Sequence, residues 1–187
     1  MSRKSSQYEL TAVGYYADWV SVPVAAAIAI FWLYASQWYP DPELAISAAI
    51  FGAGTWTLIE YLVHRFAFHQ VEPYKHQHGI HHGYPADYIG VSPGVTIAIL
   101  VALGFALPAA LGPSLGIGYF VGLLGGYLAY IILHDRYHHG YSFDWLRRNH
   151  EWHHRRPTVN FGVSSPLWDF VFQTYSVPPP GMPRIPR

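Results

Sequence analysis

Residues 117–139 read IGYFVGLLGGYLAYIILHDRYHH, an uncharged apolar run up to Leu133 that passes directly into a cluster of histidines. A helix needs about 20 predominantly apolar residues to cross the hydrocarbon core of a bilayer. His134 and His138 lie one helical turn apart and share a helix face. Neutral imidazole is the commonest protein ligand for transition metals. The stretch therefore predicts a membrane-spanning helix over residues 117–133 whose end carries metal ligands.

Three more apolar runs, at residues 20–38, 44–63 and 95–111, have similar lengths. Aromatic residues stand toward the ends of the runs, as at membrane interfaces: Trp32, Trp38, Tyr39 and Tyr119. Glu60 is the only charged residue that we expect inside a span. Charged residues make up 12% of the 187-residue chain, about half of the roughly 25% typical of soluble domains. We expect a single-domain, all-α integral membrane protein with four transmembrane helices, rather than a soluble fold with four buried helices.

The charges predict the orientation of these spans. The first short loop carries Asp41 and Glu43, the loop at residues 112–116 is uncharged, and all 11 Lys and Arg lie on the opposite side. The positive-inside rule makes that side cytoplasmic, together with both termini. It also holds the histidine regions, residues 64–90 and 134–175, which we expect to form a cytoplasmic helical cap. A net charge of zero gives no basic footprint for nucleic acid.

All 12 histidines fall in four clusters: His64 and His69; His76, His78, His81 and His82; His134, His138 and His139; His150, His153 and His154. His64 and His69 are five residues apart and diverge on an ideal α-helix. We interpret them as bracketing the frayed end of the second span, with one imidazole turning in from each side. About ten such ligands exceed what one metal ion uses, so the clusters predict a two-metal centre. The chain has no cysteine, which excludes thiolate ligands.

Other interpretations of the histidines remain open. They could be interfacial polar residues or an unselective metal-binding tract, although the interleaved aromatic residues Phe66, Phe68, Tyr137 and Trp152 favour a packed site. His150, Glu151 and His154 also satisfy H-E-x-x-H, the signature of zinc metalloproteases. A metal carrier is a third possibility, but a transporter would place its ligands near the bilayer midplane.

The pattern resembles the fatty acid hydroxylase/sterol desaturase superfamily, and within it most closely the fatty acid 2-hydroxylases. HRFAFH at residues 64–69 has their H-x4-H form, and HGIHH at residues 78–82 has their H-x2-H-H form. His134 and His138 match an H-x3-H element, and His150 to His154 match the final H-x2-H-H. FGVSSPLWDFVFQT, at residues 161–174, resembles the segment after the last box, so that the likeness covers residues 44–174.

The resemblance implies a set of ten metal ligands: His64, His69, His78, His81, His82, His134, His138, His150, His153 and His154. Other polar side chains are candidates for orienting these imidazoles through their distal N–H groups: Glu60, Asp135, Glu151, Asp169, His76 and His139. Three residues are candidates for contact with the substrate: Tyr84, Asn160 and Trp168.

The resemblance also implies two iron ions, for which zinc can substitute in purified protein because it outcompetes Fe²⁺ for nitrogen ligands. It implies hydroxylation of an acyl chain of a fatty acid or lipid at C2, with O2 and two electrons. We expect no fused cytochrome b5 domain, so the electrons would come from a separate cytochrome b5-like protein, ferredoxin or similar donor. An alternative within the superfamily is hydroxylation or desaturation of a sterol, a carotenoid or another lipid. The membrane is either the bacterial inner membrane or the endoplasmic reticulum.

Overall fold

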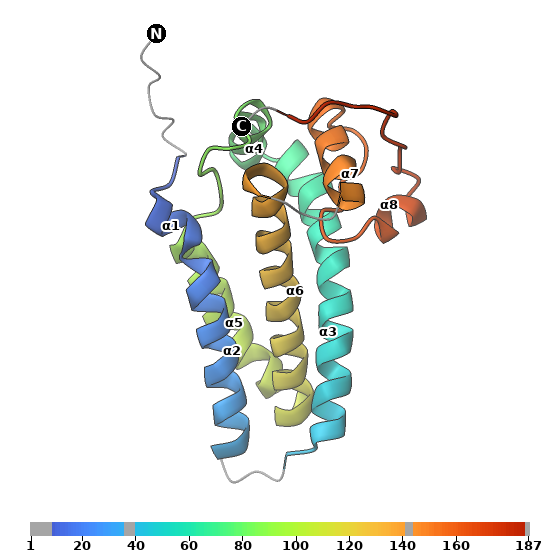
Figure 1. The fold of residues 1–187 in the computed structure, drawn as a ribbon. Coiled ribbons are helices and arrows are strands. Elements are labelled where there is room, and N and C mark those ends of the chain that lie inside the picture. Colours follow the sequence, from blue (N-terminus) through green and yellow to red (C-terminus); the bar gives the residue numbers. More distant parts are fainter. Residues whose placement is uncertain (1–8, 36–39, 141–143, 186–187) are drawn as a thin grey trace.

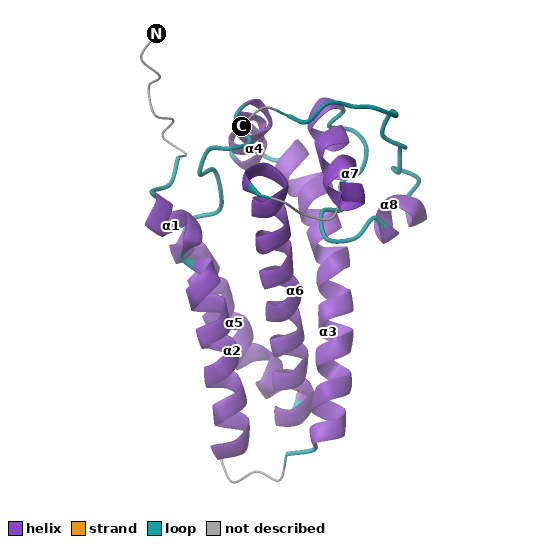
Figure 2. Cartoon of the chain, in the orientation of Figure 1, coloured by secondary structure: helices purple, strands orange, loops and turns teal. Residues whose placement is uncertain are grey.

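The computed structural model describes residues 9–35, 40–140 and 144–185. Within these ranges the regular structure is helical, and the only β-pairing is an isolated bridge between Glu9 and Ile89 (Figure 2). The helices are α1 (Ala12–Tyr16), α2 (Asp18–Ala35), α3 (Pro42–Leu62), the π-helix η1 (Val63–Phe68), α4 (Tyr74–Gly83), α5 (Pro93–Leu111), α6 (Pro113–His139), α7 (Asp144–Arg155) and α8 (Leu167–Val171). The all-α prediction is confirmed.

Four helical segments are long and apolar enough to cross a membrane: Ala12–Ala35, Pro42–Phe68, Pro93–Leu111 and Pro113–His139. They run side by side as the long helices of Figure 1. Large apolar side chains point outward from them, including Phe31, Phe51 and Phe105, each at least 70% exposed. An apolar surface of this extent suits hydrocarbon and not water. The protein is a multi-pass membrane protein, as the hydropathy predicts.

The helices extend beyond the apolar runs that predict them. The first candidate span begins at Ala12 and not at residue 20, so it includes Asp18. Glu60 is the only charged residue within the four apolar runs, whereas the longer helical segments also include Asp18, Glu43, Arg65, Asp135 and Arg136. Asp18 is buried and accepts a hydrogen bond from the Tyr127 hydroxyl at 2.6 Å, which reduces the cost of placing a carboxylate there. Trp38 and Tyr39, which we placed at an interface, lie outside the described residues.

Prolines and one aspartate define where the helices begin. Pro42, Pro93 and Pro113 each occupy the first turn of a long helix. Proline is favoured there because its fixed φ suits the helix and no hydrogen bond is lost. At the start of α3, the Asp41 side chain also accepts the Leu44 N–H at 3.0 Å, as an N-cap does.

Glycines let α3 and α6 approach closely along their length. Gly118 and Gly122 of α6 face the backbone of Ala45 and Ala49 of α3. A Cβ atom at Gly122 would lie 2.0 Å from the Ala49 carbonyl oxygen, and one at Gly118 would lie 2.3 Å from that of Ala45. Small residues at helix contacts are typical of membrane proteins, where close van der Waals packing drives association. This contact brings the histidine-bearing ends of α3 and α6 together.

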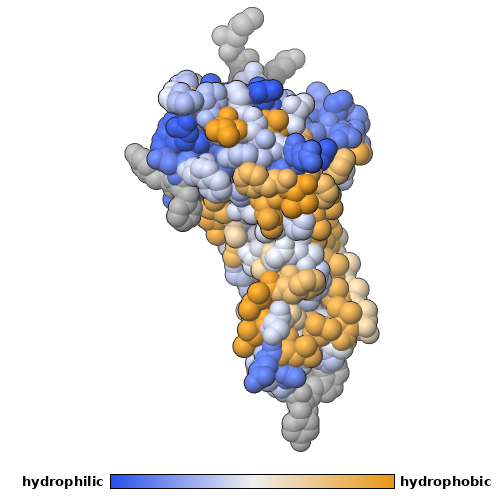
Figure 3. All heavy atoms as spheres, turned by 90° about the vertical axis from the view of Figure 1, so that its right-hand side faces the viewer, coloured by the Kyte–Doolittle hydropathy of each residue, from blue (hydrophilic) through white to orange (hydrophobic). Residues whose placement is uncertain are grey.

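A cap covers those ends, formed by α4, α7, α8 and their connecting segments (Figure 1). The face in Figure 3 is mostly hydrophilic over the cap and carries broad hydrophobic patches over the long helices below it. The histidine clusters therefore lie between an apolar bundle and a polar cap.

Candidate metal centre

The predicted ligands gather in two groups of five. The first histidine group comprises His64, His69, His78, His82 and His153, and the second comprises His81, His134, His138, His150 and His154. In each group, one ligand nitrogen from every histidine lies within 4.8 Å of the others. The two groups adjoin, since the rings of His82 and His154 stack with centroids 4.3 Å apart. All ten predicted ligands fall in one group or the other.

Each H-x-x-H-H box contributes to both groups. In α4, His78 and His82 belong to the first group and His81 to the second. In α7 the division is reversed, because His150 and His154 belong to the second group and His153 to the first. Residues four apart share a face of an α-helix, whereas the histidine adjacent to the last of them points about a quarter-turn away. Each of the two helices therefore supplies ligands to both groups.

A π-helical turn places His64 and His69 in the same group. α3 continues without a break into η1, whose hydrogen bonds run from residue i to i+5. This winding brings residues five apart onto one face, and the centroids of the two imidazoles lie 5.1 Å apart. The interpretation of a frayed span end with imidazoles turning in from opposite sides was wrong. π-Turns within α-helices are rare, and those that occur often lie at functional sites.

The nitrogen separations fit metal coordination. Neighbouring imidazoles meet through their Nε2 atoms at 3.0–3.1 Å: His64 with His78, His78 with His82, and His69 with His153 in the first group, and His138 with His150 and His150 with His154 in the second. Two nitrogens about 2.1 Å from one metal and at right angles lie roughly 3.0 Å apart, whereas the tetrahedral angle would separate them by roughly 3.4 Å. The measured separations are thus compatible with neighbouring ligands of one metal ion.

Backbone carbonyls orient two ligands of the first group. The Nδ1 atom of His64 bonds to the Phe161 carbonyl, and that of His153 to the Val159 carbonyl at 2.7 Å. A carbonyl only accepts, so both Nδ1 atoms carry the hydrogen and both Nε2 lone pairs point into the group. In the second group, both ring nitrogens of His81 are buried without a hydrogen-bond partner among the described residues, so one of them is free to bind a metal ion.

The seven candidate ligands outside the spans have pKa values below that of an ordinary histidine, so their rings are neutral at pH 7. Burial, followed by the neighbouring His82, lowers the pKa of His69 to about 4, and burial lowers the pKa of His82 to about 4. Burial together with neighbouring histidines holds the pKa well below the ordinary value for the remaining five: His78, His81, His150, His153 and His154. Metal binding needs the unprotonated ring, so burial prepares these side chains as ligands.

Two buried carboxylates hold the loop that carries those carbonyls. Glu60 of α3 accepts the N–H groups of Val163 and Ser164 and the Ser164 hydroxyl. Asp169 accepts the N–H groups of Phe161 and Gly162, both at 2.8 Å. Both acids were predicted to orient imidazoles, and in the structure they support the loop whose Phe161 carbonyl receives His64. The sequence could not predict which backbone carbonyls orient the imidazoles, because every residue has a backbone carbonyl.

We expect Glu60→Ala to lower metal affinity or activity about 10- to 100-fold, the range for groups that support a ligand. The change leaves the N–H groups of Val163 and Ser164 without their acceptor and loosens the support of His64. Glu60→Gln keeps one acceptor oxygen and should lose less. Metal content after dialysis against a graded chelator measures the effect, with the exposed Glu43 of the same helix replaced by alanine as control. Equal retention of metal in all three variants would contradict this role.

The other predicted orienting residues make contacts away from the ligand nitrogens. Asp135 accepts the Tyr16 hydroxyl at 3.1 Å and lies 3.0 Å from Nδ1 of His139. The Nε2 atom of His139 donates to the Ala86 carbonyl. Glu151 is buried and pairs with Arg147 at 2.6 Å. His76 is exposed and belongs to neither group.

The three predicted substrate contacts do not line the cavity that lies between the histidines and the interior of the helical bundle. Tyr84 is 55% exposed and follows the end of α4. Asn160 is buried and binds the backbone of Ser176 through its side-chain N–H and carbonyl groups, at 2.8 and 2.7 Å. Trp168 donates its indole N–H to the Thr57 hydroxyl at 2.9 Å. The contacts of Asn160 and Trp168 tie the C-terminal segment to the rest of the cap and to α3.

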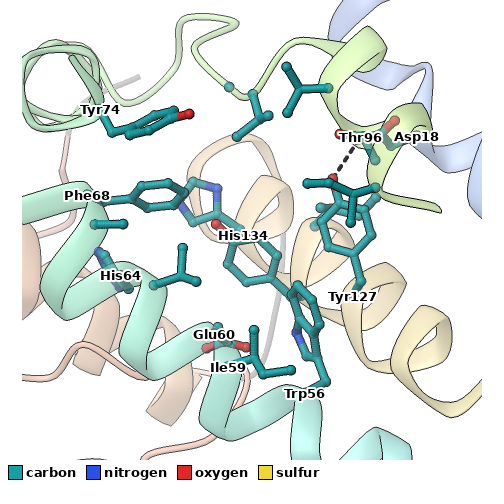
Figure 4. Close-up of a pocket in the computed structure, with 18 of the residues that line it drawn as sticks. Asp18, Trp56, Ile59, Glu60, His64, Phe68, Tyr74, Thr96, Tyr127 and His134 are labelled. Carbon is teal, nitrogen blue, oxygen red and sulfur yellow. Dashed lines mark hydrogen bonds between the residues drawn. The ribbon is translucent and has the colours of Figure 1, made fainter. Parts of the chain in front are cut away.

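That cavity, of about 450 Å³, connects the histidines with the interior of the helical bundle (Figure 4). Its size is within the range of small-molecule sites. Most of its wall is apolar, including Ile59, Phe68, Leu103 and Phe120. Both groups border it, through His64 and His78 of the first and His81 and His134 of the second. An apolar molecule held there would lie against both groups at once.

The sequence matches the family model described as fatty acid hydroxylase over residues 49–174. It is 34% identical over 154 residues to the dihydroceramide fatty acyl 2-hydroxylase FAH2 of Arabidopsis thaliana, covering 75% of this chain and 65% of the relative. It is 32% identical over 173 residues to FAH1 of the same plant, covering 83% and 73%. The ceramide very long chain fatty acid hydroxylase scs7 of Schizosaccharomyces pombe is 30% identical over 176 residues, with coverage of 83% and 50%.

A solved structure is also similar, that of full-length scs7p, in which only the hydroxylase domain is visible. The two chains align with a TM-score of 0.72 and 26% identity, over 96% of this chain and 71% of that one. The chain thus spans from half to about three quarters of the length of the relatives it matches.

Proposed function

The chain belongs to the fatty acid hydroxylase family, and from this membership we propose that it hydroxylates the acyl chain of a fatty acid or lipid at C2. The relatives named as fatty acyl 2-hydroxylases support this position of attack. Oxidation of a sterol, a carotenoid or another lipid, or desaturation in place of hydroxylation, is the alternative within the superfamily. Residues 1–187 act as one membrane domain in this proposal.

The observation that carries the proposal is that both histidine groups open onto one apolar cavity among the membrane-spanning helices. A lipid can reach such a cavity from the bilayer with its acyl chain already removed from water. The ten histidines are the proposed ligands, five to each of two iron ions, with zinc able to take their place in purified protein. When bound, the metals supply the redox chemistry that converts R–H, O2, two electrons and two protons into R–OH and water.

The protein supplies binding, orientation and a dry site. Tyr130 stacks on His134 with ring centroids 5.8 Å apart, so that it covers one face of a proposed ligand beside the cavity. Trp56 packs against Tyr127 and Tyr130 of α6, at 5.1 and 6.2 Å, where α3 and α6 form the wall. These rings exclude water from the space below the histidines and leave an apolar surface for the acyl chain.

The test of the proposal is product analysis with isotopic oxygen. Membranes containing the protein, supplied with a reductant, an electron donor and ¹⁸O2, should form 2-hydroxyacyl lipid that carries ¹⁸O, measured by mass spectrometry. The purified protein should hold two metal ions per chain. An unsaturated product, or an oxidised sterol or carotenoid, would assign the alternative. Absence of every oxidised lipid despite two bound iron ions would refute the function.

The electrons come from a separate protein in this proposal, a cytochrome b5-like protein, a ferredoxin or a similar donor. A hollow of about 370 Å³ next to His69 supports an approach from the cap, since Arg65, Pro157 and Thr158 also line it. The segments 65–70 and 155–161 around it contain three arginines and no acid. Such a surface favours a donor with an acidic face.

We expect the cap and its histidines to face the cytoplasm, of a bacterial inner membrane or of the endoplasmic reticulum. Because the chain has no cysteine, single replacements can be labelled without background. In intact bacterial cells, a membrane-impermeant maleimide should label Ala110→Cys, at the exposed end of α5, and should label Lys75→Cys of α4 only after permeabilisation. The reverse pattern would overturn the orientation.

The H-E-x-x-H match makes a zinc protease the remote alternative, and Glu151 separates the two. A protease would need this carboxylate free to activate water, but it pairs with Arg147 at 2.6 Å. We expect Glu151→Gln, which keeps the shape and removes the charge, to retain hydroxylase activity within about 10- to 100-fold of the parent. Formation of 2-hydroxyacyl product by this variant and by the control Glu43→Gln, at an exposed position of α3, checks the expectation. A dead Glu151→Gln enzyme that still binds two metals would contradict it.

A further inference from the structure

The outward face of α8 is apolar, although α8 belongs to the polar cap. Leu167, Phe170, Val171 and Phe172 follow one another closely in the chain and are 43–55% exposed. Figure 3 views the side on which α8 lies in Figure 1, and it shows hydrophobic atoms at the lower edge of the cap, next to those of the long helices. Single exposed apolar side chains are ordinary, but a contiguous group marks a contact with another molecule or with lipid.

The segment around α8 carries no outward charge that would oppose contact with lipid. Asp169 is the only charged residue between Arg156 and Arg184. It is 0% exposed, and its carboxylate turns inward to accept the N–H groups of Phe161 and Gly162. The segment therefore keeps its one charge inside the protein and presents apolar side chains outward.

The backbone on either side of α8 is paired without the help of water. The N–H groups of residues 161–164 donate to the carboxylates of Asp169 and Glu60. Those of residues 172–175 donate to backbone carbonyls of residues 168–170. Lipid chains accept no hydrogen bond, so non-helical backbone occurs at membrane depth only where the protein satisfies it. These N–H groups meet that condition.

α8 lies against the last turns of α3, within the length that crosses the hydrocarbon. Trp168 donates its indole N–H to the Thr57 hydroxyl at 2.9 Å, and Phe172 stacks on Tyr61 with ring centroids 5.3 Å apart. Thr57 and Tyr61 follow the exposed Glu43, near the opposite end of α3, by roughly 21 and 27 Å along the helix axis. The hydrocarbon core is about 30 Å thick, and any tilt of α3 shortens these distances across the bilayer. With Glu43 at one boundary of the core, α8 lies just inside the other.

The position of α8 also affects the first histidine group. Asp169 of α8 accepts the Phe161 N–H, and the Phe161 carbonyl accepts the hydrogen on Nδ1 of His64. Displacement of α8 from α3 would therefore loosen the support of this proposed ligand.

We propose that the outward face of α8 is a lipid-docking surface, which inserts among the acyl chains of the cap-side leaflet and thereby holds α8 and its loop in place. Interfacial helices bury their apolar face roughly 5–10 Å into the boundary between headgroups and acyl chains, which agrees with the position of α8 beside Thr57 and Tyr61. The occupant is the bilayer and not a protein, because the face continues the lipid-facing surface of α3, where Phe51 is 70% exposed. The docking does not depend on the proposed hydroxylation.

Fluorescence quenching of the zinc-loaded protein in phosphatidylcholine vesicles tests this. The chain has no cysteine, so Leu167→Cys and Val171→Cys can each carry a single fluorescent label. The two quenchers are lipids with a nitroxide near the top of the acyl chain, and iodide in the water on both sides of the membrane. We expect the lipid quencher to act strongly on both labels, as on the control Phe51→Cys of α3. Iodide should act several-fold less on them than on Val71→Cys, an exposed site of the cap beyond the span.

Two results would overturn the proposal. Quenching of the α8 labels by iodide as strongly as at Val71→Cys would place α8 in water. Protection of these labels from both quenchers would mean that a protein, such as a second copy of this chain, covers the face.

Val171→Asp tests the link to the metal centre. A carboxylate on this face favours water over acyl chains, so it should expose the label at Leu167→Cys to iodide. It should also lower the zinc affinity about 10- to 100-fold, the range for groups that support a ligand. Val71→Asp is the matched control and should change neither measurement. An exposed label with unchanged zinc affinity in Val171→Asp would overturn the link between α8 and His64.

Discussion

Removing one histidine from either group should abolish lipid hydroxylation and lower the metal content of the protein. His153→Ala takes a fully buried nitrogen ligand from the first group, and His81→Ala takes a buried one from the second. Four imidazoles then remain in that group, and the metal loses one nitrogen ligand that the packed site cannot replace. The fall in activity should exceed about 100-fold, the upper end of losses for groups that only support a ligand.

Metal analysis and 2-hydroxyacyl product measured on the same samples check this expectation. His76→Ala is the control, because His76 is an exposed histidine outside both groups on the same helix as His81. Each ligand variant should retain about one metal ion per chain, held by the group that keeps all five of its histidines. Full metal content and activity in either variant would remove that histidine from the proposed set, and loss of activity in His76→Ala would contradict the division.

Placing a large side chain at Gly122 should prevent correct assembly of the helical bundle. A Cβ atom there would lie 2.0 Å from the Ala49 carbonyl oxygen and 2.7 Å from its carbon. These are backbone atoms, which cannot rotate away, so Gly122→Leu forces α3 and α6 apart. Overpacking ordinarily costs about 1–3 kcal/mol, and a backbone clash puts this change at or beyond the upper end.

Gly125→Leu is the matched control, since it lies on the same helix with nothing within 4 Å of its Cβ position. The yield of monodisperse protein and the thermal unfolding temperature in detergent should fall sharply for Gly122→Leu and little for Gly125→Leu. Metal content should fall with them, because the α3–α6 contact brings His64 and His134 to the same cavity. Equal stability of the two variants would show that α3 and α6 do not pack as closely as described.

The membrane spans follow from the sequence because hydrophobicity acts locally. A run of about 20 apolar residues crosses a bilayer whatever its neighbours do, and the four helices lie where the runs predict them. Their ends could not be read in the same way. Residues 12–19 continue the first span, where Asp18 accepts one hydrogen bond from Ser21 of its own helix and one from Tyr127, and the bond from Tyr127 exists only after α2 packs against α6.

The identity of the candidate ligands likewise follows from the sequence, since spacings of three and four residues place imidazoles on one side of a helix. Their distribution between two groups does not. His81 and His82 are neighbours in the chain and belong to different groups, because α4 meets η1 with one side and α6 with another. Such a division depends on which helices approach which face.

Sequence by itself determined the apolar runs, the helix faces and the chemical type of every candidate ligand, because these properties belong to single segments. Tertiary structure alone decided that a π-turn brings His64 and His69 together, that Glu60 and Asp169 support the loop bearing the Phe161 and Val159 carbonyls, and that Asp18 borders the cavity. The π-turn is a local winding, whereas the other features arise from contacts between residues distant in the chain. The free energy of such contacts depends on how the helices pack, and no local spacing records it.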